Sequence, residues 1–148
     1  MARTSTRTDA TPERVFKVLI DAEAYPRWVV GAKQVRAVDD GWPAPGTAFH
    51  HSVGAGPASV DDATTVVELD PPRRLVLRGR ARPLGTMAIV LDVRRAGDET
   101  EITITEQPAA GPPTWLQGPS AWAMDVLIHL RNIESLRRLR RLAEAPST

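Results

Sequence analysis

The order of the predicted elements constrains the fold of this chain more than any single motif does. A helix-start signal, Thr11-Pro12-Glu13, is followed by five or six runs with strand character, and a long helix over about 119–144 closes the chain. Thr11 can cap the first helix, with Pro12 at its first position and Glu13 in its first turn. A long helix that returns after a meander of strands packs naturally across the concave face of the sheet. This order predicts a shell with a cavity between helix and sheet.

The strand-like runs alternate apolar and polar residues. Such alternation gives each strand one buried and one wet face, which is typical of an antiparallel sheet. Glu106 follows Ile102 and Ile104 in the same phase, so this carboxylate is predicted to point inward with them. In the two preceding runs, the apolar residues of the alternation are predicted to face the interior. They are Leu75, Leu77, Met87, Ile89, Leu91 and Val93.

Length and composition indicate one domain over residues 1–148, long enough to bury a core. There is no cysteine, which excludes disulfides and thiolate chemistry. The N-terminus lacks the apolar segment of a signal peptide, and no apolar run approaches the roughly 18 residues of a membrane span. We therefore expect a cytoplasmic protein without stable membrane insertion.

The charge pattern gives no sign of a nucleic-acid partner. The net charge is +1, so the field of the whole protein favours neither nucleic acid nor an anionic membrane. Four arginines gather near the end of the long helix, where cations suit the helix dipole. We interpret this cluster as a solvated helix end rather than a nucleic-acid or phospholipid patch. Its members are Arg137, Arg138, Arg140 and Arg141.

Several stretches together resemble the START-related superfamily (SRPBCC), which includes polyketide cyclase/dehydrase and lipid-transport proteins. They are Thr11-Pro12-Glu13-Arg14-Val15-Phe16, Asp21-Ala22-Glu23-Ala24-Tyr25-Pro26-Arg27-Trp28, Gly46 before a strand, Leu69-Asp70-Pro71-Pro72-Arg73-Arg74-Leu75, and Arg131-Asn132-Ile133-Glu134-Ser135-Leu136-Arg137-Arg138-Leu139. The resemblance implies an α+β helix-grip fold. In that fold a seven-stranded antiparallel sheet wraps around the long C-terminal helix, and two short helices follow the first strand. A shared fold does not carry one activity with it.

Few residues could carry acid–base chemistry. His50 and His51 are adjacent in a strand and point to opposite faces, so they cannot bind one metal together, and His51 is the pocket candidate. Asp125 and His129 are four apart on the long helix, where a carboxylate could orient an imidazole as a general base, or form only a surface pair. The catalytic candidates are therefore His129, Asp125 and Glu106. We expect no metal site and no cofactor.

The predicted cavity combines the inward phases of the strands with one face of the long helix. At 100° per residue, Trp122 and Val126 share a helix side with Leu130 and Ile133, and we expect that side to face the sheet. The predicted ligand-binding residues are Trp28, His51, Leu77, Met87, Ile89, Ile104, Glu106, Trp122, Val126 and His129.

Three hypotheses of function remain open at this point. The first is binding of a small hydrophobic ligand, lipid- or polyketide-like, between the sheet and the helix. The second is a polyketide cyclase/dehydrase-type enzyme that uses a pocket His or Glu as acid or base. The third is a ligandless interaction module, and a homodimer is left open. Cavity size discriminates among them, because ligand sites commonly measure ~300–1,000 Å³ and a packed interior favours the third.

Overall fold

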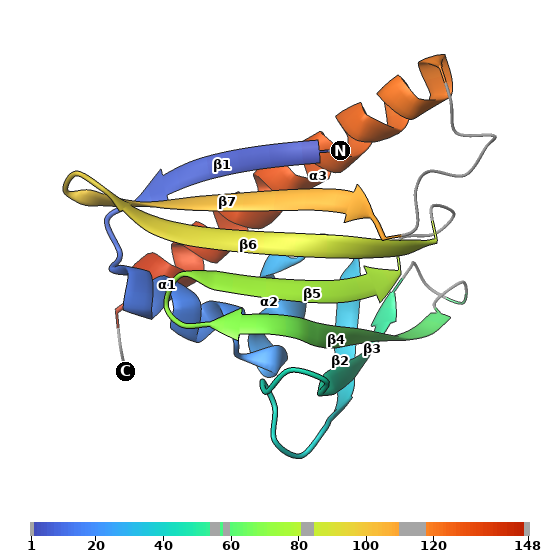
Figure 1. Cartoon of the computed structure of the whole chain (residues 1–148), viewed down its shortest axis with the longest axis horizontal. Coiled ribbons are helices and arrows are strands. Elements are labelled where there is room, and N and C mark those ends of the chain that lie inside the picture. The colour runs from blue at the N-terminus through green and yellow to red at the C-terminus, as the bar shows by residue number, and fades with distance from the viewer. Residues whose placement is uncertain (1, 54–56, 58–59, 81–84, 110–117, 147–148) are drawn as a thin grey trace.

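The computed structural model describes residues 2–53, 57, 60–80, 85–109 and 118–146. Seven strands form one sheet in the order β1-β7-β6-β5-β4-β3-β2, and every neighbouring pair is antiparallel. The long helix α3 crosses behind the sheet, as Figure 1 shows, so the predicted helix-grip fold is confirmed. The strands are β1 (Ala2–Thr8), β2 (Ala32–Val38), β3 (Ala48–Val53), β4 (Val60–Asp70), β5 (Arg74–Arg80), β6 (Thr86–Ala96) and β7 (Glu99–Pro108). The helices are α1 (Pro12–Leu19), the 3-10 helix η1 (Ala22–Ala24), α2 (Tyr25–Trp28) and α3 (Pro119–Glu144).

Local sequence signals explain where the short helices begin. Thr11 caps α1, and its hydroxyl accepts a hydrogen bond from the backbone N–H of Arg14 at 3.2 Å. Asp21 caps η1 in the same manner, through the backbone N–H of Glu23 at 3.1 Å. Pro26 lies in the first turn of α2, where a missing N–H costs nothing.

The strand register confirms the predicted inner face of the sheet. Ile89 of β6 lies between Leu77 of β5 and Glu106 of β7, so all three side chains share one face. Gly97 makes the β6–β7 hairpin turn at a φ of +65°, a region that favours glycine. The largest apolar side chains of the inner face, which are almost fully buried in the main core, are Phe49, Val66, Leu75, Leu77, Leu91 and Ile102.

Helix α3 packs on this face with its C-terminal half. Leu136, Leu139 and Ala143 join the core formed by the sheet and helix α1. Nearer its start, Ile128 contacts a second small cluster with Ala2 of β1 and Met87 of β6. No helix in the described part of the chain is long and apolar enough to cross a membrane.

The expectation that Trp122 and Val126 face the interior is wrong. Trp122 is 71% exposed and Val126 is 37% exposed. Val126 lies about 140° around the helix from buried Leu139, so packing of the C-terminal half turns it away from the sheet. Trp122 lies only about 40° from Leu136, but it sits in the first turn of α3, and the start of this helix extends past the edge strand β1 (Figure 1). Leu127, Leu130 and Ile133 are exposed as well.

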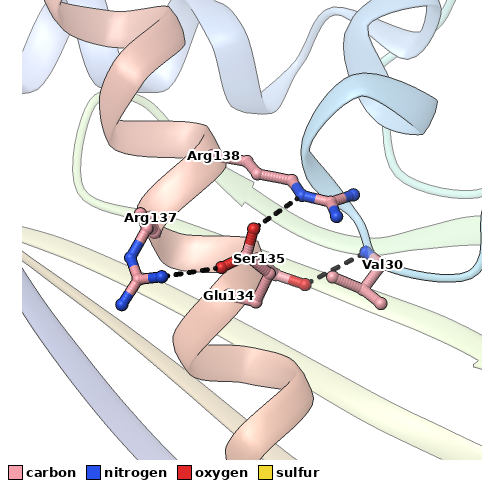
Figure 2. A network of polar contacts seen from close by, with 5 residues as sticks. All are labelled: Val30, Glu134, Ser135, Arg137 and Arg138. Carbon is pink, nitrogen blue, oxygen red and sulfur yellow. Dashed lines mark hydrogen bonds and ion pairs between the residues drawn. The ribbon is translucent and has the colours of Figure 1, made fainter.

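The orientation of α3 is also fixed by polar contacts, which Figure 2 shows. Ser135 accepts a hydrogen bond from the backbone N–H of Val30, at 3.1 Å, which ties the helix to the segment between α2 and β2. On the outer side, Glu134 accepts hydrogen bonds from Arg137 and Arg138, each at 3.1 Å. Arg140 pairs with Glu144 at 3.1 Å. Three of the four clustered arginines therefore pair with two carboxylates on the same helix.

Candidate ligand-binding site

The inner face of the sheet, α2 and α3 enclose a small cavity. Its sheet side is apolar except for Glu106 of β7, and its helix side carries further polar groups. The volume is about 20 Å³, close to that of one water molecule. A cavity of this volume alone would fit a ligandless protein. The chemistry of the lining residues is therefore the stronger guide to whether the cavity binds a ligand. The lining residues are Tyr25, Trp28, Val29, Leu77, Ile89, Leu91, Ile104, Glu106, Arg131, Asn132 and Ser135.

A buried ion pair closes one side of this cavity. Nη2 of Arg131 donates to both carboxylate oxygens of Glu106, at 2.5 and 2.6 Å. The Glu106 side chain is 5% exposed and the Arg131 side chain 34% exposed, so the guanidinium extends from the surface into the interior. Burial raises the pKa of the Glu106 carboxyl, and the Arg131 charge and hydrogen bonds oppose that shift.

Tyr25 brings a phenol to the same place. Burial is the main cause that raises its pKa to about 12, the Glu106 carboxylate raises it further, and Arg131 lowers it. The ring packs edge-on against Trp28, with ring centroids 5.4 Å apart. Tyr25 therefore stays neutral at physiological pH and presents a hydroxyl rather than a phenolate.

His51 contacts the ring of Tyr25 but is not among the residues that line the described cavity. Its Nε2 is 2.8 Å from the hydroxyl of Thr64, and its ring centroid is 5.8 Å from that of Tyr25. Burial lowers the pKa of His51, and the nearby carboxylate of Asp62 opposes that effect. The ring also lies 5.2 Å from that of Phe49, so His51 is part of the aromatic cluster, and contact of His51 with a ligand stays a prediction.

The structure brings half of the predicted ligand-binding residues together. The described cavity is lined by Trp28, Leu77, Ile89, Ile104 and Glu106. Met87 lies on the predicted face, but it packs in the second cluster, against Ala2 and Ile128. Contact of any of these residues with a ligand stays a prediction.

His129 also lies outside this cavity. It is an exposed residue of α3, and its Nδ1 is 2.8 Å from the hydroxyl of Thr4 on β1. This contact ties the helix to the edge strand. The acid–base role suggested for Asp125 and His129 stays a hypothesis, and nothing in the described lining places a substrate next to them.

Sequence reasoning missed the polar groups that α3 contributes. Arg131, Asn132 and Ser135 line the cavity, although the apolar pattern of the helix pointed to another side. Spacing of three and four residues places them on one face, with Ile128 before them. A search for polar residues in phase with Leu136 and Leu139 could have found them. No group of three His, Asp or Glu side chains suited to a metal occurs among the residues that the structure describes.

Comparison with known families identifies the class of protein. Residues 1–144 match the family described as polyketide cyclase / dehydrase and lipid transport. The chain belongs to this family. This family supports a domain of the hydrophobic-ligand-binding or polyketide-cyclase type. A search of curated proteins finds no match to the sequence.

Solved structures show the same fold at low sequence identity. Protein CV1439 from Chromobacterium violaceum aligns with a TM-score of 0.68 at 20% identity, over 97% of each chain. Ara h 8.0201 aligns with a TM-score of 0.72 at 11% identity, over 95% of each chain. The di-domain ARO/CYC BexL from the BE-7585A biosynthetic pathway aligns with a TM-score of 0.65 at 17% identity, over 98% of this chain and 50% of the BexL chain. At these identities the likeness establishes the fold alone.

Proposed function

We propose that this protein binds a small hydrophobic molecule, lipid- or polyketide-like, between the inner face of the sheet and α3. One observation carries the proposal: an apolar sheet wall meets a small set of buried polar groups from α2, β7 and α3. Pockets for small molecules commonly have this composition, with apolar walls and a few polar groups that fix orientation. The cavity holds about 20 Å³ in this structure, so binding a whole ligand requires α3 and the sheet to move apart.

A fluorescent apolar probe tests this proposal. The wild-type protein should enhance the emission of the probe with saturation, and Ile89→Trp should abolish the response, because Ile89 lies on the cavity wall. Overpacking at this site costs about 1–3 kcal/mol, so the fold of the variant is checked by circular dichroism. Val90→Trp is the matched control, since Val90 is next in the strand and points to the opposite face. An unchanged response in Ile89→Trp would assign the probe to another site.

The ligandless module is the second candidate, and the small cavity volume favours it. Native mass spectrometry of freshly purified protein separates the two. A copurified small molecule supports binding. A bare chain mass, together with a wild type that leaves the probe emission unchanged, supports the module.

The cyclase-type alternative requires turnover. Acid–base groups typically contribute a factor of 10²–10⁴, so a true catalytic residue should lose at least a hundredfold on substitution. Glu106 is the candidate inside the cavity, but Arg131 holds both of its oxygens. We therefore propose that Glu106 organises the site and does not transfer protons. A hundredfold loss of polyketide turnover in Glu106→Gln would establish the enzyme instead.

A further inference from the structure

Two buried hydrogen-bond donors of the described cavity have no protein partner. Nε1 of Trp28 and Nδ2 of Asn132 are both inaccessible and unpaired. Both residues line the cavity, one from α2 and one from α3. Trp28 is 2% exposed and Asn132 is 1% exposed. Independent elements of the fold thus bring two unsatisfied N–H groups to one small space.

Such an arrangement destabilises the protein when nothing accepts from these donors. A buried donor without a partner has lost its hydrogen bond to water without a replacement, and a buried indole N–H usually has an acceptor. An indole nitrogen can only donate, so the missing partner of Trp28 is an acceptor atom. A buried, unpaired indole N–H on a residue that lines the cavity becomes favourable when an acceptor that enters the cavity comes within its reach.

We propose that this cavity is a subsite for a neutral oxygen acceptor, a ketone or similar carbonyl at the end of the hydrophobic ligand, which Trp28 and Asn132 bind. This inference rests on the proposed function and adds the polar group that the ligand must carry. In this structure the cavity of about 20 Å³ has room for one small terminal group, and the rest of the ligand enters only when α3 and the sheet move apart. The carbon frame next to the carbonyl contacts the apolar wall of Leu77, Ile89 and Ile104.

The charges around the cavity favour a neutral acceptor over an anion. The Glu106 carboxylate lies in the lining, and the guanidinium of Arg131 already binds both of its oxygens. A second carboxylate would be buried beside Glu106 without a new counter-charge, so its desolvation would not be compensated. A ketone oxygen avoids this cost and still satisfies the N–H donors.

A matched pair of probes tests the subsite. In 2-acetylnaphthalene a carbonyl oxygen occupies the place that a methylene group occupies in 2-isopropenylnaphthalene, and the shapes are nearly the same. The wild type should bind the ketone about 3- to 10-fold more tightly, which is the effect of one hydrogen bond. In ¹⁵N-labelled protein the indole N–H resonance of Trp28, assigned from Trp28→Phe, should move downfield with the ketone only.

The variants locate the effect. Trp28→Phe keeps an aromatic ring but removes the donor, so the ratio of the ketone affinity to the isopropenyl affinity should fall toward one, whatever change the smaller ring causes in both affinities. Trp122→Phe is the control, because Trp122 is exposed on the outer side of α3. Equal affinities for the two probes, with an unmoved Trp28 resonance in the wild type, would overturn the subsite and leave hydrophobic binding intact. Failure of both probes to bind would overturn the subsite and the proposed function together.

Discussion

Replacing Arg131 by methionine isolates the contribution of the buried ion pair. The substitution keeps an unbranched side chain of similar reach and removes the guanidinium that donates to both oxygens of Glu106, at 2.5 and 2.6 Å. Glu106, only 5% exposed, then has no counter-charge at its carboxylate. The matched control is Arg137→Met, because Arg137 pairs with Glu134 at the surface of the same helix.

The loss of stability in this variant has a calculable ceiling. Without Arg131 the folded protein can keep a buried charge or take up a proton on Glu106. Uptake costs about 1.4 kcal/mol for each pH unit above the ordinary Glu pKa of 4.5. The ceiling is therefore about 3.4 kcal/mol at pH 7 and about 1.4 kcal/mol at pH 5.5. Breaking a fully buried pair typically costs 3–5 kcal/mol, so the variant should approach this limit at neutral pH.

The sign of the pH dependence follows from the direction of the shift. Burial already raises the pKa of Glu106, and loss of Arg131 removes the groups that lower it. A group whose folded-state pKa is raised stabilises the fold at low pH and loses that contribution as pH rises through the folded pKa. The stability of Arg131→Met relative to wild type should therefore improve on acidification from pH 7 to pH 5.5.

Urea or thermal unfolding at the two pH values measures this effect. At pH 7 the melting temperature should fall by roughly 6–12 °C, given 2–4 °C per kcal/mol for a chain of this size. About half or more of the loss should disappear at pH 5.5. Arg137→Met should stay within about 1 kcal/mol of wild type, as expected for an exposed pair. A loss that is the same at both pH values would refute the ion-pair reasoning, and so would no loss at pH 7.

Two further predictions concern the histidines. Burial lowers the pKa of His51 below its ordinary 6.5, so the unfolded state takes up a proton before the folded state does as pH falls. Between pH 7.5 and 5.5 the free energy of unfolding of the wild type should therefore fall by up to about 1.4 kcal/mol relative to that of His51→Gln. Parallel stability curves for the two proteins would show that His51 is not the cause. His129→Ala should lower stability by about 0.5–1.5 kcal/mol through loss of the contact with Thr4 at 2.8 Å, with probe affinity within twofold of wild type. A large loss of affinity on that substitution would place His129 in the binding site.

The sequence alone determined the faces of the strands. In a strand, side chains alternate between the two faces, so one buried residue fixes which of its other residues face inward. The pattern thereby assigns Leu77, Ile89, Ile104 and Glu106 to one wall. The start of α1 was equally accessible, because Thr11 and Pro12 act on their own helix turn. These features depend on neighbours in the chain and are therefore visible in it.

Only the tertiary structure decided the rotation of α3. The helix has apolar residues on two sides, Val126 and Leu130 on one and Leu136 and Leu139 on the other, and periodicity cannot say which side meets the sheet. Packing of the C-terminal half against the core made that choice, and a rigid helix then carried Asn132 inward and Val126 outward. Trp122 is exposed for another tertiary reason, because the start of α3 extends past the edge of the sheet (Figure 1). Cavity volume and the pairing of Glu106 were likewise set by contacts between elements far apart in the chain. Sequence patterns record the preference of each element, whereas the site arises from how those elements pack together.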